Sequence, residues 1–426
     1  MMKELYYRDT EKIRKKQWAF LREQLLYTSR NSPFYRELFR KHKIDLSRLA
    51  SYNDFRRISL TTKEDLQQQN SEFISVAKEE IIDFVTTSGT LGDPVSLALN
   101  EADLERLATN EMKSFQMAGV KKQDVVQITT TLDRRFMAGM AYFLGLCKLG
   151  AGIVRTGSGL PKLQWDSIER FQPKYLVAVP SFLLKMIEFA EANGIDYRNS
   201  SVKAAICIGE PLRNEHLELN GLATRIRKLW NLELFSTYAS TEMATAFTEC
   251  EMHHGNHILS DLIFTEVLNN RGEPVEDGEI GELVVSPLQT RTMPLLRYAT
   301  GDMVKIFREP CACGRNTPRL SPVIGRKKQM LKLKGTSVYP QQIINALNSF
   351  SGIESFVIEA RTGALDTDEL FIKISRIGEQ ELQEIKEHLK SSLQVTPQIE
   401  ETEKAVIEEL KFPKQSRKPQ IFIDYR

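Results

Sequence analysis

Seven residues rich in hydroxyl groups and glycine, Thr86 to Gly92, carry the clearest chemical signal in the sequence. They follow 81–85, which is typical of a short buried strand, and they precede 95–99, which alternates like a second strand. Small residues let backbone N–H groups converge on an anion, and hydroxyls add donors for phosphate oxygens. The segment lacks the lysine of a Walker loop, and Pro94 ends it. Two interpretations stay open at this point, a phosphate-binding loop and an ordinary hairpin turn.

The composition is that of an ordinary globular protein. The chain has 426 residues, 41% hydrophobic and 27% charged, with a net charge of +2, so it has room for two or three domains. This charge gives no reason to expect nucleic acid or a membrane as partner, and no apolar run reaches transmembrane length. Five cysteines without an N-terminal signal pattern predict a reducing compartment, so we expect a cytoplasmic protein.

A strand-then-helix rhythm follows N-terminal helices that we expect within 3–50. The strands are predicted at 124–129, 152–154, 175–180 and 202–208, and the helices at 101–117, 136–149, 165–171, 181–193 and 213–229. Continuous apolar strands that alternate with helices are typical of a parallel sheet covered on both faces. Ligands bind beyond the C-terminal ends of such strands, and 209–211 directly follows one of them.

The pattern changes twice towards the C-terminus. Strands and turns from 259 onwards alternate as in an antiparallel sheet, and a mixture of helices and strands begins after 325. The sequence therefore predicts an α/β fold with a large N-terminal domain over 1–325, whose parallel-rich sheets are covered by helices. An antiparallel, barrel-like subdomain is expected at about 259–324. A hinge linker over 326–334 would lead to a small, mobile α+β domain over 335–426.

The Gly/Thr segment and four later motifs occur in an order that resembles the adenylate-forming superfamily of acyl-CoA synthetases. Within it, the sequence is most similar to the phenylacetate–coenzyme A ligase family. The later motifs are Tyr238-Ala239-Ser240-Thr241-Glu242, Arg297-Tyr298-Ala299-Thr300-Gly301-Asp302, Gly325-Arg326-Lys327-Lys328 and Pro413-Lys414-Gln415-Ser416-Arg417-Lys418. The resemblance spans nearly the whole chain, and five motifs in order are far more specific than one. It implies that a carboxylate and ATP form an acyl-adenylate, which a thiol then converts to a thioester.

The resemblance also implies a role for each motif. Lys418, Thr241 and Glu242 would be catalytic, and Glu242 would ligate Mg²⁺, which prefers carboxylate and phosphate oxygens. The ATP- or AMP-binding residues would be Thr87, Ser88, Gly89, Thr90, Gly92, Gly209, Glu210, Pro211, Tyr238, Ala239, Ser240, Asp302 and Arg326. Lys328 would mark the hinge. The acid pocket would be lined by Phe136, Met137, Ala138 and Gly139. Taken singly, most of these residues fit an ordinary turn, helix start or solvated basic loop equally well, and their joint order favours the functional interpretation.

Two positions depart from the family pattern. Asp93 stands where the Gly/Thr loop usually carries a lysine, which removes a cation near the phosphates and introduces an anion. Ala239 replaces the usual glycine of the tyrosine motif and adds one methyl group. The first departure keeps open a relative that binds nucleotide without catalysis.

Cys250, His257, Cys311 and Cys313 form a set of three thiols and one imidazole, the ligands that tetrahedral zinc prefers. Some members of the resembling family carry such a cluster at matching places, so we expect structural zinc. His253 or His254 could replace His257, and free thiols, a Cys-x-Cys disulfide or a vestigial site stay open. The apolar sequence neighbours of the other two cysteines, Cys147 and Cys207, predict inert core positions.

The leading hypothesis is an ATP-dependent acid–thiol ligase that activates an aryl or arylacetic acid and transfers it to coenzyme A. Its partners would be the carboxylic acid, ATP and coenzyme A, with Mg²⁺ and structural zinc. An alternative acceptor is the phosphopantetheine of an acyl carrier protein, and a homodimer also stays open.

Overall fold

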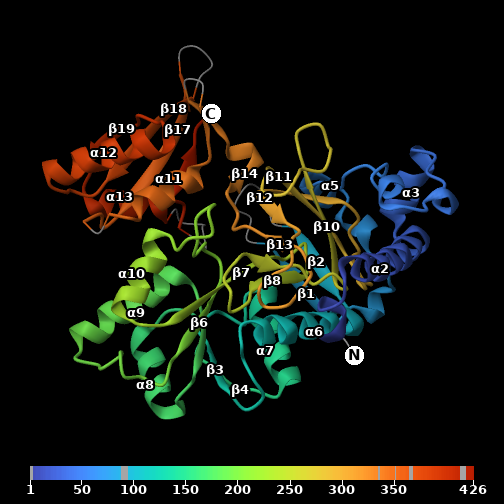
Figure 1. Cartoon of the computed structure of the whole chain (residues 1–426), viewed down its shortest axis with the longest axis horizontal. Helices are drawn as coiled ribbons and strands as arrows, with labels where there is room; N and C mark the ends of the chain where they lie inside the picture. The colour runs from blue at the N-terminus through green and yellow to red at the C-terminus, as the bar shows by residue number, and fades with distance from the viewer. Residues whose placement is uncertain (1–2, 88–94, 334–335, 351, 364–367, 413–418) are drawn as a thin grey trace. The chain divides into compact units, whose positions relative to one another are not determined.

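A computed structural model of the chain confirms the predicted α/β fold class (Figure 1). It describes residues 3–87, 95–333, 336–350, 352–363, 368–412 and 419–426. The chain divides into two compact units. The first comprises Met1–Leu212, Ile226–Thr300 and Val304–Pro322, and the second comprises Arg213–Arg225, Gly301–Met303 and Val323–Arg426. Among the described residues, no helix combines the length and the apolar character needed to span a bilayer.

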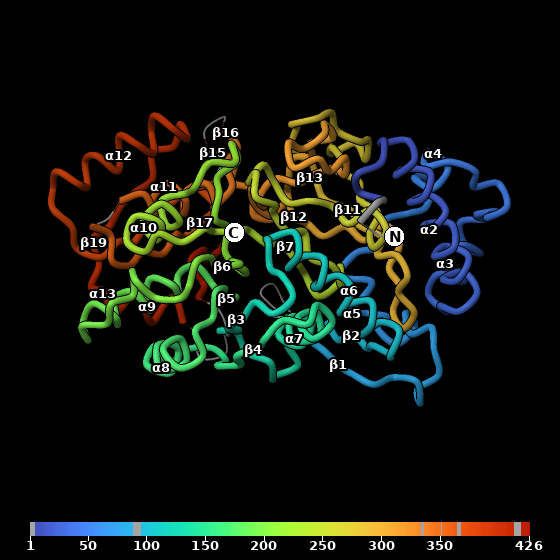
Figure 2. Tube along the Cα trace, turned by 60° about the horizontal axis from the view of Figure 1, so that its bottom comes forward, coloured from blue at the N-terminus to red at the C-terminus, as the bar shows by residue number. Residues whose placement is uncertain are grey.

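The N-terminal part of the first unit is helical, as the sequence predicts. Its helices are α1 (Lys3–Tyr6), α2 (Thr10–Asn31), α3 (Pro33–Lys41), α4 (Tyr52–Phe55) and α5 (Lys63–Gln68). They lie on the side of the later strands β10 (Ile263–Leu268) and β11 (Ile280–Pro287); Figure 1 labels β10 next to α2, and Figure 2 shows α2 and α4 on the side of β11. Gln17 Nε2 of α2 donates to the carbonyl oxygen of Ile263 (3.0 Å). The Tyr52 ring of α4 stacks on Phe264, with ring centroids 5.1 Å apart.

The central part of the first unit is a parallel sheet with helices on both faces. Its strands are β3 (Val125–Ile128), β4 (Gly152–Arg155), β5 (Tyr175–Ala178), β6 (Ala204–Cys207) and β7 (Glu233–Ser240). Its helices are α6 (Glu101–Met117), α7 (Met137–Leu149), α8 (Pro161–Phe171) and α9 (Pro180–Ala192), and the part of α10 (Gly221–Leu229) from Ile226 onwards also belongs to this unit. Alternate residues of a strand face opposite sides. Val126 and Ile128 of β3 therefore share a core with Tyr142 of α7, while Gln127 Nε2 donates to Gln164 Oε1 of α8 (2.8 Å).

The predicted helix at 213–229 is wrong in its first half, because α10 begins only at Gly221. Asn214 Oδ1 accepts the backbone N–H groups of His216 (2.9 Å) and Glu218 (3.1 Å). Asparagine side chains compete with helical hydrogen bonds in this way. Leu217 is left-handed, with a φ of +66°, which ends any helical run. A side-chain-stabilised turn therefore replaces the predicted first two turns of helix.

The strand β7 joins two kinds of sheet. It pairs in parallel with β6 and, through Thr237–Ser240, antiparallel with β8. The antiparallel strands are β8 (Thr245–Glu249), β9 (Asn256–His257), β10, β11, β12 (Tyr298–Phe307) and β13 (Arg319–Leu320). The hydrogen-bonded order is β10-β11-β12-β13-β9-β8-β7-β6-β5-β3-β4. Antiparallel pairing thus begins before 259, at the end of β7 itself.

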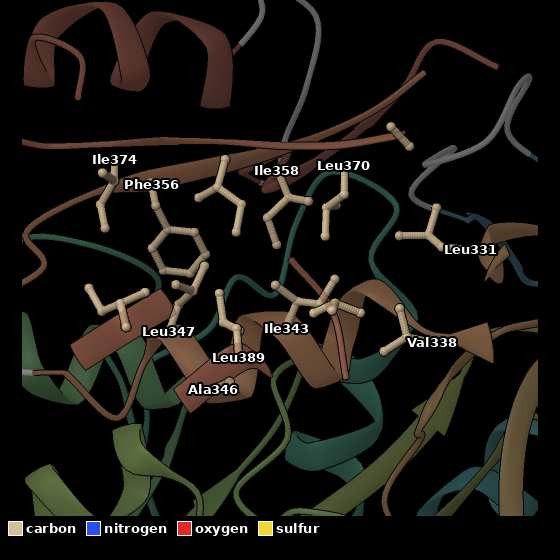
Figure 3. Close-up of a cluster of buried hydrophobic side chains, with 14 residues drawn as sticks. Leu331, Val338, Ile343, Ala346, Leu347, Phe356, Ile358, Leu370, Ile374 and Leu389 are labelled. Carbon is tan, nitrogen blue, oxygen red and sulfur yellow. The ribbon is translucent and has the colours of Figure 1, made fainter. Parts of the chain in front are cut away.

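The second unit contains a sheet in the order β19-β18-β17-β20. Its elements are β14 (Gly325–Arg326), β15 (Leu331–Leu333), β16 (Thr336–Val338), α11 (Pro340–Leu347), β17 (Phe356–Thr362), β18 (Asp368–Ile374), α12 (Glu379–Leu393), β19 (Gln398–Glu401), α13 (Lys404–Lys411) and β20 (Phe422–Asp424). Figure 3 shows its core, where Phe356, Ile358 and Leu370 of the strands face Ile343 of α11 and Leu389 of α12. This is the α+β arrangement that the sequence predicts for the C-terminal region.

Glu111 is a charged residue type at a buried position between α6 and α7. The two helices pack so closely that a Cβ atom on Gly145 would lie 2.4 Å from the Glu111 Cβ. The Glu111 side chain makes no hydrogen bond or ion pair with the described residues, and burial raises its pKa to about 8. At neutral pH the carboxyl group therefore carries its proton in the folded chain, whereas the unfolded chain releases it.

We expect the Glu111→Gln substitution to stabilise the protein at pH 7 by about 3 kcal/mol. A folded-state pKa raised from 4.5 to about 8 means that wild-type stability is full below pH 4.5 and falls as the pH rises towards 8. Glutamine does not titrate, so the gap between the two proteins should widen by about 1.4 kcal/mol per pH unit in this window. Urea unfolding of both proteins between pH 5 and 8 measures it. Exposed Glu105 on the same helix supplies the control, Glu105→Gln, and a pH-independent gap at Glu111 would contradict the assignment.

Candidate active site and metal cluster

Two paired antiparallel strands flank the predicted phosphate-binding segment. The strands β1 (Asp83–Thr86) and β2 (Ser96–Leu99) pair so that Thr86 lies opposite Ser96. Inside this pair, the Thr87 N–H donates to the Val95 carbonyl oxygen (2.9 Å), and the Val95 N–H donates to Thr87 Oγ1 (2.9 Å). The two predicted strands are confirmed, and the turn predicted between them lies outside the described residues. Ser88, Gly89, Thr90, Gly92 and Asp93 lie outside the described residues, so their predicted role remains a prediction.

The tyrosine motif begins in the antiparallel end of β7. Tyr238 stacks on Phe247 of β8, with ring centroids 5.8 Å apart, and Ala239 and Ser240 complete the strand. A tight turn then carries Thr241 and Glu242, in which the Ala244 N–H donates to the Thr241 carbonyl oxygen (3.2 Å). The sequence did not distinguish this turn from the start of a helix.

Glu242 brings two of the sequence motifs together. Its Oε1 accepts a hydrogen bond from the Tyr298 hydroxyl (3.4 Å), and Tyr298 belongs to the Arg-Tyr-x-Thr-x-Asp motif. The neighbouring Arg297 is buried and pairs with Glu266 (2.9 Å) while it donates to the Ile58 carbonyl oxygen (2.5 Å). The motif arginine therefore fixes the backbone beside Tyr298.

A small cavity lies behind Glu242 in the first unit. Its lining residues are Leu97, Ala98, Leu99, Asp103, Arg106, Met137, Glu242, Ala244, Pro287, Thr290 and Met293. Most of this wall is apolar, so charges that face it are only weakly screened. Met137 contributes to the cavity from the first turn of α7, and its predicted place in the acid pocket remains a prediction.

Arg106 supports the turn that carries Glu242, and the sequence analysis missed it. The buried guanidinium donates to Thr245 Oγ1 (2.9 Å), to the Ala244 carbonyl oxygen and to the Leu262 carbonyl oxygen (2.5 Å). Burial lowers its pKa to about 10, so the side chain remains charged at neutral pH. The sequence contains one signal that could have pointed to Arg106. It lies one helical turn after Asp103, the residue that forms the capping box of α6 with Asn100.

Gly209, Glu210 and Pro211 follow β6, at the predicted C-terminal edge of the parallel sheet. Gly209 is left-handed, with a φ of +76°, which glycine adopts at little cost. The Glu210 carboxylate accepts from the N–H (2.9 Å) and the hydroxyl (2.8 Å) of Ser181 in the first turn of α9. This contact anchors the segment to the helix, and its predicted contact with adenine remains a prediction.

The predicted acid-pocket residues lie at the start of α7. Phe136 precedes the helix, Met137 is buried, and Ala138 packs against the central core. At Gly139 an added Cβ atom would lie 2.0 Å from the Thr131 carbonyl oxygen, so only glycine fits there. Gly139 is thus required by close backbone packing, a reason that is independent of any substrate.

Two predicted nucleotide-binding residues lie together in the second unit. Asp302 and Arg326 are paired neighbours in β12 and β14, and Arg326 Nε lies 3.5 Å from Asp302 Oδ1. Lys328 lies in the 3₁₀ turn Lys327–Gln329 that follows. Lys418 is outside the described residues. The proposed roles of these four residues in nucleotide binding, hinge motion and catalysis remain predictions.

The predicted metal ligands form one cluster. The ligand atoms of Cys250, His257, Cys311 and Cys313 all lie within 4.8 Å of one another. The Cys250 and Cys311 sulfur atoms are 3.8 Å apart, and Cys313 Sγ lies 3.6 Å from His257 Nε2. A tetrahedral ion with Zn–S bonds of about 2.3 Å holds two sulfur atoms about 3.8 Å apart, so the donor set fits zinc.

The surroundings of His257 favour it over His253 as the nitrogen ligand of such an ion. Burial, with Arg315 and Arg319 nearby, lowers its pKa to about 3, which keeps the imidazole neutral as metal ligation requires. Its Nδ1 lies 3.2 Å from Thr317 Oγ1, which leaves Nε2 directed at Cys313. His253, one of the alternatives, instead lies between Glu233 (2.5 Å) and Glu249 (3.3 Å).

The prediction of a core position is confirmed for one of the two remaining cysteines and is wrong for the other. All five cysteines are free, so no Cys-x-Cys disulfide is present. Cys207 is buried in β6, as predicted, but Cys147 is exposed on α7 and that prediction is wrong. Its apolar sequence neighbours Gly145 and Leu146 point to the core, while the helical rotation turns Cys147 outwards beside exposed Lys148.

Residues 32–290, more than half of the chain, match the family described as AMP-binding enzyme. The chain belongs to this family. It is 29% identical to the phenylacetate–coenzyme A ligase of Thermus thermophilus over 86% of this chain and 82% of that protein. It is 25% identical to the Escherichia coli enzyme of the same name, over 82% of this chain and 79% of the relative. The motif-based resemblance to the phenylacetate–coenzyme A ligase family is thereby confirmed.

The fold is also that of a solved ligase. A crystal structure of 2-hydroxyisobutyryl-CoA ligase, in the postadenylation state with an acyl-AMP, superimposes with a TM-score of 0.85. The superposition covers 99% of this chain and 91% of that chain, at 23% sequence identity. At this identity the likeness supports the fold of this AMP-binding enzyme and leaves its substrate open.

Proposed function

We propose that this AMP-binding enzyme is an ATP-dependent acid–thiol ligase that activates an aryl or arylacetic carboxylate and transfers it to coenzyme A. The observation that carries the proposal is the contact between Glu242 and Tyr298, because it joins two separate motifs of the family beside one cavity. The curated relatives named phenylacetate–coenzyme A ligase support the choice of acid and acceptor.

In the first half-reaction a carboxylate oxygen attacks the α-phosphorus of ATP, and pyrophosphate leaves. Both reactants are anions, so the reaction requires charge neutralisation and positioning more than covalent help. The Glu242 carboxylate is half-buried and accepts one long hydrogen bond, from the Tyr298 hydroxyl. A carboxylate in this position suits a ligand of Mg²⁺. The bound ion would neutralise phosphate charge. Thr241, in the same turn, would hydrogen-bond the α-phosphate.

In the second half-reaction the thiol sulfur attacks the acyl carbon, its proton is lost, and AMP leaves. We infer that Lys418 serves the adenylation step, where a flexible ammonium group can bridge the carboxylate and the α-phosphate. Asp302 would accept the ribose hydroxyls, which requires its ion pair with Arg326 to be shared or exchanged. Lys328 would mark the pivot between the two half-reactions.

We also propose that the cysteine cluster binds one structural zinc ion. Four protein ligands leave no open coordination position, so the ion would stabilise the fold rather than take part in catalysis. The cluster lies among the buried residues Tyr6, Met117, Leu259 and Leu262. A metal there would hold the Cys311–Cys313 turn to Cys250, directly after β8, and to His257 of β9. The free thiols and the cytoplasmic assignment are consistent with each other.

Pyrophosphate release over a panel of aryl, arylacetic and fatty acids, with and without coenzyme A, tests the proposed reaction. We expect release with at least one aryl or arylacetic acid, and an acyl-CoA product when coenzyme A is added. Release without any CoA thioester would favour a carrier-protein phosphopantetheine as acceptor. No release with any acid would favour a nucleotide-binding relative without catalysis, the alternative that Asp93 raises.

A further inference from the structure

The turn that carries Glu242 ends in a residue with a left-handed backbone conformation. Residues 241–244 connect β7 to β8, and the φ angle of Ala244, the last of them, is +45°. Residues with a Cβ atom adopt this conformation at a cost. Such strain persists where surrounding contacts fix it, and it is common at active sites. A contact that holds Ala244 in this conformation therefore also determines where Glu242 lies.

The buried Arg106 side chain of α6 makes this contact. Its Nη1 donates to the Ala244 carbonyl oxygen, and its Nη2 donates to Oγ1 of the next residue, Thr245 (2.9 Å). Its Nε donates to the Leu288 carbonyl oxygen (2.5 Å), directly before Gln289, which is also left-handed with a φ of +61°. One guanidinium group thus holds two strained backbone segments, and residues of both segments line the small cavity.

The same face of α6 holds other segments through buried polar side chains. The Asp103 carboxylate accepts two backbone N–H groups of the segment 291–292 (2.8 and 2.9 Å). Lys113 Nζ donates to Asp261 Oδ2 (2.6 Å). Positions three and seven residues apart share a face of a helix, so these side chains and Arg106 form one polar row. Arg106 is the member of this row that reaches the end of the turn.

We propose that Arg106 is a positioning residue, which holds Glu242 where it can ligate Mg²⁺ by fixing the left-handed conformation of Ala244. The inference rests on the proposed function, because it takes Glu242 as the Mg²⁺ ligand. A guanidinium group presents its donors in a rigid planar fork, so it fixes its acceptors in direction as well as in distance. Mg²⁺ demands near-ideal octahedral geometry, so a small rotation of the turn would weaken metal binding while the fold stays intact.

Calorimetric binding of ATP to the Arg106→Lys variant, with Mg²⁺ and with a chelator, tests the proposal without requiring turnover. Lysine keeps the buried charge but lacks the planar fork. We expect the gain in ATP affinity that Mg²⁺ provides to fall at least about tenfold, the scale of one charge-assisted contact. ATP without Mg²⁺ should bind within about twofold of wild type, because the remaining contacts are unchanged.

Two substitutions at Ala244 test whether the backbone conformation carries the effect. Glycine adopts the left-handed conformation at little cost, so Ala244→Gly should restore most of the Mg²⁺ gain in the Arg106→Lys background. A β-branched residue strongly disfavours this conformation. Ala244→Val should therefore cause the same selective loss with Arg106 in place, which keeps the test open if Arg106→Lys does not fold.

Lys113→Gln is the matched control, because it changes a buried cation in the same row of α6 whose partners are Tyr6 and Asp261. It should keep the Mg²⁺ gain even if its melting temperature falls. Equal weakening of ATP with and without Mg²⁺ in Arg106→Lys, or an equal loss of the gain in Lys113→Gln, would overturn the proposal. Failure of Ala244→Gly to restore the gain would also overturn it.

The Glu242→Gln variant separates this inference from the proposed function. If it loses the Mg²⁺ gain while Arg106→Lys keeps the gain, the proposed role of Glu242 stands and the inference about Arg106 fails. If Glu242→Gln keeps the gain, the role of Glu242 and the inference fall together. If wild type binds Mg²⁺ and ATP but no acid gives pyrophosphate, the ligase function fails, while the role of Arg106 is still decided by the binding ratios.

Discussion

Replacing Glu242 with glutamine is expected to lower the rate of pyrophosphate release about 10²- to 10³-fold, the usual cost of removing one preorganised transition-state contact. Glutamine keeps the shape of the side chain and an oxygen ligand, but it lacks the negative charge that Mg²⁺ prefers. The loss should therefore be greatest at low Mg²⁺, and excess Mg²⁺ should restore part of the rate. Pyrophosphate release measured against Mg²⁺ concentration gives both values.

Two further variants separate the charge of Glu242 from its surroundings. Tyr298→Phe removes the 3.4 Å hydrogen bond to Glu242 and should cost less than about tenfold, because the bond is long. Glu251→Gln changes an exposed carboxylate in the β8–β9 turn, at the opposite end of β8 from Glu242, and should have no effect. The assignment would be wrong if Glu242→Gln lost the same fraction of activity at every Mg²⁺ concentration, or if its loss followed from a lower melting temperature.

The purified protein is expected to contain one equivalent of zinc, and Cys313→Ser should remove most of it. Cys250 and Cys311 are buried in an apolar cluster, so their substitution would also disturb packing, whereas Cys313 is half-buried. Loss of the ion should lower the free energy of unfolding by on the order of 5 kcal/mol, part of the roughly 10–16 kcal/mol that zinc binding supplies to small metal-dependent folds. Metal analysis and urea unfolding measure the two effects.

The exposed Cys147 provides the control for thiol loss. Cys147→Ser should keep both the zinc content and the stability of wild type. Less than one equivalent of zinc in carefully prepared wild type, together with unchanged stability in Cys313→Ser, would count against a structural ion. The histidine can be tested separately, because His257→Gln should lose zinc while His253→Gln should retain it.

The sequence predicted the elements best where one pattern controls both local and long-range structure. Apolar runs such as 175–178 and 204–207 became parallel strands because burial on both faces leaves no alternative for them. The helix predicted from 213 failed because Asn214 supplies local hydrogen bonds that no hydrophobic period reveals. The predicted core position of Cys147 was wrong because neighbouring residues in a helix do not share a face.

The sequence revealed the motifs of the candidate site, but it did not reveal the buried residues that support them. Glu242 and the cluster of Cys250, His257, Cys311 and Cys313 are residues that their types and order single out in the sequence. Arg106 was missed because its importance depends on acceptors more than 130 residues away, including the Ala244 carbonyl oxygen. Glu111 was missed because its burial depends on Gly145 of a neighbouring helix. Such pairings arise from tertiary packing and leave no periodic trace.

The strand β7 has a consequence for recombination between relatives. Its residues Glu233–Ser236 complete the parallel ladder with β6, and Thr237–Ser240 begin the antiparallel ladder with β8. A chimaera joined inside β7 would take the two ladders from different parents, and an offset of one residue would turn every following side chain to the opposite face. Crossovers placed at exposed Gly194, before β6, keep both ladders from a single parent. The modular boundary of this enzyme therefore lies before β6, and β7 is inherited with the turn that carries Glu242.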